Sequence, residues 1–393
     1  MALLSYSAPP KLDNSKYAAM GWPRYLWMKI KLMRLLFVLP FEILVSPVVA
    51  RSKTKSFKRV VGDTLFRFVT DTLPDVELQY FLGTSVGIYS EWARKERLPI
   101  TIDELPSEGK LLWIGPKKTE KVILFCHGGA YIAPLQNFML PFWRFIQLEL
   151  ERRGLEVGIA IMSYSVIPVA HFPTPLWQAN QAIKHLTYVE NVKPSNLQLV
   201  GDSAGGNLVS QILSSMLHPS FSPPIIPPGT RLRGVYMMSP WISMTGAGSR
   251  ESNEILPSFI ENDHTDVLST DSLLRWGSDV LSGLQNPSFE VPFVDPIRAP
   301  SDWYKGLSDV VERVFVSTGE FECLRDADRI FFREKIQPWH GKAEFFELKG
   351  GVHNDPFFDF YVGDRPLGAR QKLTPIILDW LANGFEDNKV EEN

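Results

Sequence analysis

The chain has 393 residues, of which 45% are hydrophobic, so it can bury a large core. Its formal net charge is −3 and no basic stripe runs along it, which argues against a nucleic-acid partner. The two cysteines, Cys126 and Cys323, are too few for a disulfide framework or a zinc ligand set. We therefore expect no metal site.

An apolar segment with basic residues lies near the N-terminus, at residues 25–50. Three interpretations compete. Although two prolines interrupt it, the segment could cross a membrane or enter it as a re-entrant anchor. With Lys29, Lys31 and Arg34 among aromatic residues, it could instead form an amphipathic helix on the membrane surface. It could also be a helical lid over a binding site, and residues 1–105 together are expected to form a helical cap or membrane anchor.

From about residue 111 onward, short apolar runs alternate with stretches of helical periodicity. The expected strands are 111–114, 121–126, 157–163, 197–201, 233–238, 312–317 and 343–348. The expected helices between them are 138–152, 174–188, 205–217, 326–336 and 370–384. Such alternation predicts an α/β fold with a mostly parallel central sheet flanked by helices. We assign residues 106–386 to this domain, with a cap insertion at about 247–300, and residues 387–393 to a disordered tail.

The strongest chemical signal is the run Gly201-Asp202-Ser203-Ala204-Gly205. It follows an expected strand and opens an expected helix, which is the setting of a nucleophile elbow. Glycines on both sides of the serine relieve crowding in this tight turn, which lifts the hydroxyl above the sheet. Ser203 is therefore the candidate nucleophile.

A second signal comes earlier, where His127-Gly128-Gly129-Ala130 directly follows the second expected strand. Loops of this type offer backbone N–H donors to the oxyanion of a tetrahedral intermediate, and each donor can contribute about 3 kcal/mol. We expect Gly128, Gly129 and Ala130, together with Ala204, to surround the oxyanion. His127 is expected to shape the loop rather than to transfer protons.

The remaining chemical groups should follow in the order nucleophile, acid, histidine. Only His353 follows the last expected strand, which makes it the candidate base. The acid should come after the expected strand 312–317. Four carboxylates stand there, namely Glu320, Glu322, Asp326 and Asp328. On chemistry alone, any of the four could orient the imidazole and stabilise its cation.

Together, these motifs resemble the hormone-sensitive-lipase-like group of α/β-hydrolases, including fungal steryl-acetate-hydrolase-type members. The matching runs are HGGA at 127–130, GDSAGG at 201–206, SPW at 239–241, GEFECLRD at 319–326 and GGVHNDP at 350–356. The similarity covers roughly residues 110–384 and implies the α/β-hydrolase fold. It also implies that Glu322 is the acid, in a place where many relatives carry aspartate, with Asp326 as the alternative.

The resemblance implies a serine enzyme without cofactors that cleaves a carboxylic ester, with a short acyl group such as acetyl on a lipophilic alcohol such as a sterol or terpenoid. Aromatic residues near the expected loops suggest an apolar pocket of Phe138, Trp143, Trp241 and Phe357. Acyl transfer and amide hydrolysis by the same residues are the alternatives. A non-catalytic receptor is disfavoured, because receptors in this group resemble hydrolases that have lost the histidine. We expect an intracellular protein, either cytosolic or associated with the endoplasmic reticulum membrane.

Overall fold

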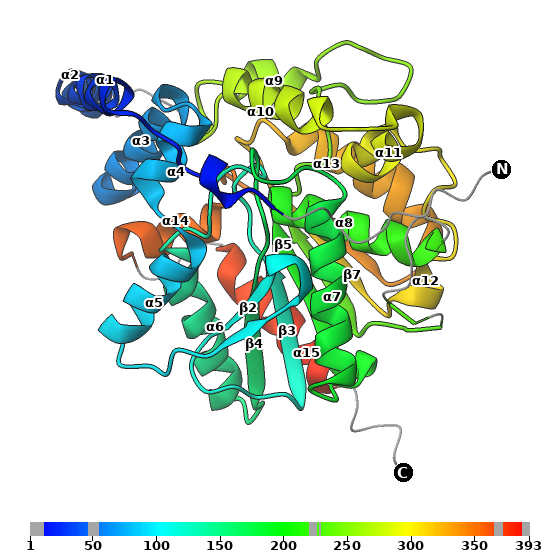
Figure 1. Ribbon diagram of the computed structural model, residues 1–393. Coiled ribbons are helices and arrows are strands. Elements are labelled where there is room, and N and C mark those ends of the chain that lie inside the picture. The colour runs from blue at the N-terminus through cyan, green and yellow to red at the C-terminus, as the bar shows by residue number, and fades with distance from the viewer. Residues whose placement is uncertain (1–11, 46–54, 220–225, 228, 365–371, 387–393) are drawn as a thin grey trace.

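The computed structural model describes residues 12–45, 55–219, 226–227, 229–364 and 372–386, so residues 46–50 of the apolar segment and the predicted tail lie outside it. At its centre is an eight-stranded sheet with the order β1-β2-β4-β3-β5-β6-β7-β8 (Figure 1). The strands are β1 (Ile102–Glu104), β2 (Lys110–Trp113), β3 (Lys121–Cys126), β4 (Val157–Ser163), β5 (Leu197–Asp202), β6 (Gly234–Met238), β7 (Val314–Gly319) and β8 (Ala343–Leu348). β2 is antiparallel to β1 and β4, and all other neighbours are parallel.

Helices cover both faces of the sheet, as the alternating pattern predicted. They are α6 (Met139–Arg152), α7 (Thr174–Tyr188), α8 (Ala204–Leu217), α13 (Arg325–Phe331), α14 (Asp355–Val362) and α15 (Leu373–Glu386). Successive strand residues point to opposite faces. Val122 and Leu124 thus join the core with α7 and α8, whereas Ile123 and Phe125 join the core with α6 and α15. Because both faces are covered, β3 to β5 are buried almost throughout.

The register of the parallel strands brings two distant motifs together. Cys126, the last residue of β3, pairs with Gly201 near the end of β5. Parallel strands end at the same edge of a sheet, so the loop that begins at His127 and the turn at Ser203 emerge side by side.

Two groups of helices cap this edge of the sheet (Figure 1). The first group precedes the sheet and consists of α1 (Trp22–Met33), α2 (Leu35–Val45), α3 (Phe57–Thr72), α4 (Asp75–Leu82) and α5 (Ser85–Lys95). The second group is inserted between β6 and β7 and consists of α9 (Pro257–Glu261), α10 (Thr270–Ser282) and α11 (Pro287–Val294). After it, α12 (Leu307–Val310) lies near the start of β6, where the N–H of Leu232 donates to the carbonyl oxygen of Val310. The two groups meet where Ser269 and Ser272 donate hydrogen bonds to Asp71 of α3.

The sheet begins earlier than the expected domain boundary at residue 106. β1 pairs with β2, so the N-terminal region supplies an edge strand as well as a cap. Its sequence, Ile-Asp-Glu, is too short to show a strand pattern. The predicted helix 326–336 also differs, because α13 ends at Phe331 and a π-helical turn, Phe332–Ile336, continues it.

The helices α1 and α2 run end to end at one corner of the molecule, joined at Arg34, which keeps helical backbone angles (Figure 1). α1 packs inward through the buried Met28. Arg24 and Lys31 of α1 both pair with Glu77 of α4, a buried carboxylate. Within the described ranges, no helix combines the length and the apolar character that a membrane crossing requires.

Candidate active site

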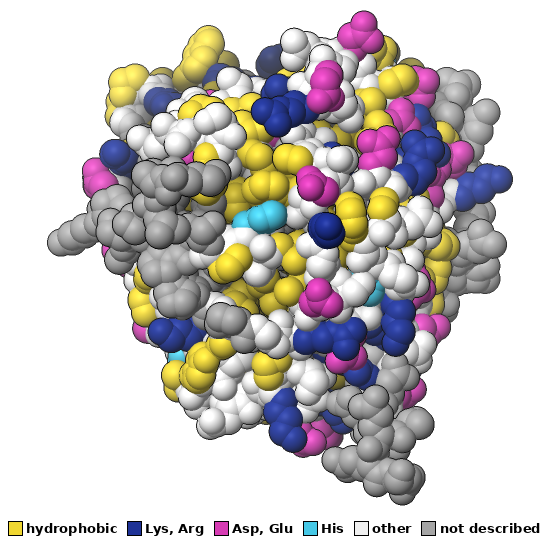
Figure 2. All heavy atoms as spheres, turned by 90° about the vertical axis from the view of Figure 1, so that its right-hand side faces the viewer, with side chains coloured by type: hydrophobic (Ala, Val, Ile, Leu, Met, Phe, Trp, Pro, Cys, Tyr) yellow, Lys and Arg dark blue, Asp and Glu magenta, His cyan; other side chains and the backbone are white. Residues whose placement is uncertain are grey.

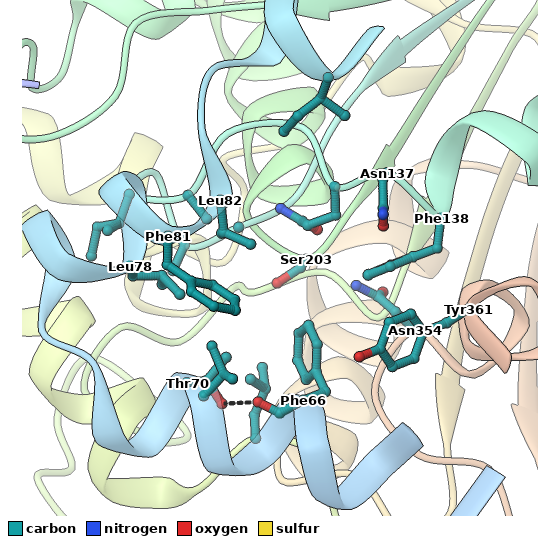
Figure 3. A pocket seen from close by; sticks show the side chains of 18 of the residues that line it. Phe66, Thr70, Leu78, Phe81, Leu82, Asn137, Phe138, Ser203, Asn354 and Tyr361 are labelled. Atoms are coloured by element: carbon teal, nitrogen blue, oxygen red, sulfur yellow. Dashed lines mark hydrogen bonds between the residues drawn. The ribbon is translucent and has the colours of Figure 1, made fainter. Parts of the chain in front are cut away.

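Ser203 occupies the turn between β5 and α8 with a strained backbone, φ 51° and ψ −120°. The turn leaves no room for side chains beside it. A Cβ at Gly201 would overlap the backbone of Gly205, and one at Gly205 would overlap the carbonyl of Cys126. This is the geometry of a nucleophile elbow, and the hydroxyl of Ser203 points into a cavity above the sheet (Figure 3).

His353 lies between β8 and α14 and contacts a carboxylate from the loop after β7. Its Nδ1 is 2.7 Å from Oε1 of Glu322, and both side chains are buried. Burial lowers the pKa of His353, but Glu322, followed by Asp266 and Asp202, raises that pKa above its ordinary value. The imidazole can therefore hold a proton at Nδ1 and receive a second one at Nε2.

The second oxygen of Glu322 is held by three donors. Oε2 accepts hydrogen bonds from the hydroxyls of Ser239 and Thr318 at 2.8 and 3.0 Å, and from the N–H of Gly319 at 2.7 Å. Three hydrogen bonds to one oxygen fix the orientation of the carboxyl group. Glu322 can thus present Oε1 to His353 without rearrangement.

The other three candidate acids do not contact His353 in the described structure. Glu320 accepts a hydrogen bond from the N–H of Gly350. Asp326 accepts one from the N–H of Ser258. Asp328 is buried within α13. Of the two residues left open by the family resemblance, the structure brings Glu322 and not Asp326 to the histidine.

The glycine-rich loop after β3 differs from expectation at one position. The N–H of Gly128 donates to Oδ1 of Asp202 at 2.7 Å, so it is not available to an oxyanion. A Cβ at this position would overlap the same carboxylate, which explains the glycine. Gly129 and Ala130 have φ of 115° and 55° and line the cavity. Their N–H groups, and that of Ala204, have no acceptor among the described residues.

Asp202 links the elbow to the loops on both sides of it. Besides binding Gly128, it accepts a hydrogen bond from the amide of Asn354 at 2.7 Å. Burial raises the pKa of Asp202 to about 7, against the effect of these hydrogen bonds and of His353. Asp202 therefore aligns three loops around Ser203.

His127 is buried at the start of the glycine-rich loop. Its ring stacks on Tyr164 with the ring centres 4.6 Å apart, and its Nδ1 lies 2.7 Å from the carbonyl oxygen of Gly128. Burial lowers the pKa of His127 to about 4, so the ring is neutral near pH 7. These contacts are those of a residue that shapes the loop.

A cavity of about 720 Å³ opens above the elbow (Figure 3). Two of the four predicted pocket residues, Phe138 and Trp241, line it. The prediction was wrong for Trp143 and Phe357, which are fully buried in the core between the sheet and α6. Trp143, for example, packs on Phe125 of β3, with the ring centres 4.7 Å apart. Closeness to a catalytic loop in sequence does not separate pocket aromatics from core aromatics.

Much of the cavity wall comes from the two caps. The cap residues on the wall include Leu65, Phe66, Val69 and Thr70 of α3, Leu78, Phe81 and Leu82 of α4, and Leu268, Leu273 and Trp276 of the insertion. Figure 3 shows Phe66, Phe81, Phe138 and Tyr361 around the Ser203 hydroxyl. None of these cap residues was predicted from the sequence. For α3 a signal exists, since the spacing 65, 66, 69, 70 places these side chains on one helix face.

The described residues contain one group that could be considered as metal ligands, Asp103, His185 and Glu190. Lys117 already binds both carboxylates, with Nζ 2.8–2.9 Å from Asp103 and 2.9 Å from Glu190. None of these four residues lines the cavity. The group is therefore an ion-pair cluster outside the site.

A mostly parallel sheet with a strained serine turn at the end of a central strand is the architecture of the α/β-hydrolase class. A family model described as alpha/beta hydrolase fold matches residues 123–356, and the chain belongs to this family. Among curated proteins, no relative matches the chain.

Solved structures share the fold at low sequence identity. An esterase from the bacterial hormone-sensitive lipase family is 19% identical, with 84% of this chain and 99% of that chain covered and a TM-score of 0.62. A hormone-sensitive lipase from a metagenome library is 18% identical, with 84% and 99% covered and a TM-score of 0.59. These matches confirm the predicted resemblance to hormone-sensitive-lipase-like α/β-hydrolases at the level of fold.

Proposed function

We propose that this protein is a serine esterase with Ser203, Glu322 and His353 as its catalytic triad. The observation that carries the proposal is that the elbow serine shares the cavity wall with His353, whose Nδ1 is held by the buried Glu322. Ser203 attacks the ester carbonyl while Nε2 of His353 takes its proton, and Glu322 stabilises the resulting imidazolium. No hydrogen bond joins Ser203 to His353 among the described atoms. Such contacts often form only once substrate is bound.

The tetrahedral intermediate places a negative charge beside the glycine-rich loop. The N–H groups of Gly129, Ala130 and Ala204 are its donors, and Ala204 also begins α8, whose N-terminus favours an anion. His353 then gives its proton to the leaving alcohol, and the acyl group stays on Ser203. Water attacks this acyl-enzyme with His353 as base, which releases the acid and restores the serine.

We infer that the alcohol part of the substrate is lipophilic and that the acyl part is short, such as acetyl. The wall of α3 and α4 offers apolar side chains to a bulky alcohol, and burying each methylene there contributes about 0.8 kcal/mol. A sterol or terpenoid acetate belongs to this class. Acyl transfer to a second alcohol and amide hydrolysis are the alternatives that the same triad supports.

The first test is a series of aryl esters from acetyl to palmitoyl, together with acetates of alcohols from ethanol to a sterol. We expect kcat/KM to fall as the acyl chain lengthens and to rise by up to about fourfold per methylene buried on the alcohol side. A preference for palmitoyl esters would contradict the substrate assignment. If no ester is cleaved and a fluorophosphonate does not label the protein, the esterase proposal fails. Product analysis with an added alcohol separates acyl transfer from hydrolysis.

We also propose that α1 and α2 bind a membrane surface, as one interpretation of residues 25–50 suggested. Of the two expected compartments, the cytosol and the endoplasmic reticulum membrane, this proposal belongs to the second. The exposed apolar residues on one stripe of the two helices are Trp22, Leu26, Ile30, Met33, Phe37, Phe41 and Leu44. Their spacing of three or four residues places them on one helix face, and Phe37 is 80% exposed. Lys29 and Arg34 are exposed beside them and suit anionic headgroups. On the face shown in Figure 2, acidic and basic side chains are instead interspersed.

This proposal predicts that the protein cosediments with anionic phospholipid vesicles. Phe37→Ser/Phe41→Ser should weaken binding by about tenfold or more, because two apolar side chains no longer enter the lipid. A matched control is Tyr188→Ser/Val189→Ser, which removes two exposed apolar side chains at the end of α7. If wild type stays in the supernatant, or if both double variants bind equally, the membrane proposal is wrong.

A further inference from the structure

The cap insertion reaches the catalytic loops through the turn between α9 and α10. Asn262 in this turn donates a hydrogen bond to the carbonyl oxygen of Glu322 at 2.8 Å. Ser258 of α9 donates to the carbonyl oxygen of Cys323 at 2.7 Å. These two hydrogen bonds connect the insertion to the backbone of the loop that carries Glu322, the acid loop.

One buried carboxylate in the same turn, that of Asp266, binds the backbone of both catalytic loops. Its Oδ1 accepts a hydrogen bond from the N–H of His353 at 2.9 Å, and its Oδ2 accepts one from the N–H of Cys323 at 2.8 Å. Cys323 directly follows Glu322 in the chain. The carboxylate therefore bridges the backbone of His353 and the backbone of the residue that follows Glu322, and the side chains of His353 and Glu322 meet at 2.7 Å.

We propose that Asp266 is a positioning residue of the triad. From the cap, its carboxylate fixes the backbone of the loop that carries His353 relative to the backbone of the loop that carries Glu322. The inference rests on the proposed function, since it assumes that Glu322 and His353 do the chemistry. The N–H of Val267 is a third donor, at 2.7 Å from Oδ1. Only a carboxylate offers acceptors on both oxygens, whereas an amide would place an N–H against one of these donors.

The charge of Asp266 serves the same reaction. Three carboxylates face His353, namely Glu322 from the loop after β7, Asp202 from the elbow and Asp266 from the insertion. Burial, and then Glu322, raises the pKa of Asp266 to about 6, so it is ionised near pH 7. An ionised Asp266 favours the imidazolium that forms when Ser203 is deprotonated.

The N-terminal cap reaches the same residue. Arg67 of α3 donates a hydrogen bond from Nη1 to the carbonyl oxygen of Asp266 at 2.9 Å. Phe66, its neighbour in α3, lines the cavity. The two caps that enclose the substrate therefore converge on the residue that positions the triad.

The test compares full-length wild type with Asp266→Asn, using kcat, KM and the pH profile of kcat/KM on an acetyl aryl ester. We expect kcat to fall by about 10- to 100-fold while KM changes little, because the triad geometry and not the cavity is altered. The acidic limb of kcat/KM should move to lower pH. His353 must be unprotonated to act as base, and losing a nearby negative charge lowers its pKa.

The matched control is Asp295→Asn, which also removes a buried carboxylate of the insertion, one that accepts from the N–H of Met244. It should keep the wild-type kcat and pH profile. The inference is wrong if Asp266→Asn loses no more activity than this control or keeps the wild-type acidic limb. Should Asp266→Asn not fold, Asp266→Ser carries the same test, because it removes the charge without adding an amide N–H. A wild type without esterase activity would instead overturn the proposed function.

Discussion

Replacing Ser203 by alanine is expected to lower kcat for ester hydrolysis by about 10⁶-fold and to abolish labelling by a fluorophosphonate. The substitution removes the nucleophile but leaves the cavity and the N–H donors of the oxyanion in place. The midpoint of thermal unfolding should change little, since the Ser203 side chain makes no capping hydrogen bond to α8. Activity assays on purified protein measure the loss of kcat, and calorimetry measures the midpoint of unfolding.

The control for this variant is Ser210→Ala, the same chemical change within the helix that follows Ser203. Ser210 is buried in α8, its hydroxyl donates to the carbonyl oxygen of Asn207, and it does not line the cavity. The Ser210→Ala variant should react with the fluorophosphonate and hydrolyse esters as wild type does. If Ser203→Ala is labelled as fast as wild type, a different residue is the nucleophile and the proposed triad is wrong.

Glu322→Gln is the second large expected effect, a loss of about 10⁴-fold in kcat. The amide cannot hold His353 in the required tautomer and cannot stabilise its cation. With its N–H₂ group on the Oε2 side, the amide would face the donors of Ser239, Thr318 and Gly319. Turned the other way, it would donate to Nδ1 of His353 and favour the wrong tautomer. Since Glu322 raises the pKa of His353, the acidic limb of the residual kcat/KM should lie at lower pH than in wild type.

Asp326→Asn separates the two acids that the family resemblance left open. Asp326 pairs with Arg325 and Arg329 and has no contact with His353, so this variant should lose stability more than activity. Measuring kcat and the unfolding midpoint for both variants decides the assignment. An inactive Asp326→Asn beside an active Glu322→Gln would reverse it.

Several features of the fold could be predicted because their causes are local. The strands 121–126, 157–163 and 343–348 and the helix 174–188 have the same bounds in the structure as in the sequence prediction. Each is a pattern of apolar residues bounded by turn residues. The elbow is local at Gly201, where a Cβ would overlap the backbone of Gly205, whereas the crowding at Gly205 comes from Cys126 on a neighbouring strand.

Other features had no local signal. Trp143 and Phe138 stand five residues apart around α6, yet one lies in the core and the other lines the cavity. The three-residue β1 is a strand only because β2 pairs with it. Gly128 resembled an oxyanion donor until the structure showed its N–H bound to Asp202, a residue 74 positions away.

The sequence by itself determined the α/β class, the order of the motifs and the identities of Ser203 and His353 as candidates, because helix and strand periodicity and tight turns are set by neighbouring residues. The tertiary structure decided which carboxylate meets the histidine, which aromatic rings line the cavity, and that Asp266 of the cap binds the N–H groups of His353 and Cys323. These are contacts between distant segments. They depend on strand order, register and loop packing, which a local pattern of residues does not encode.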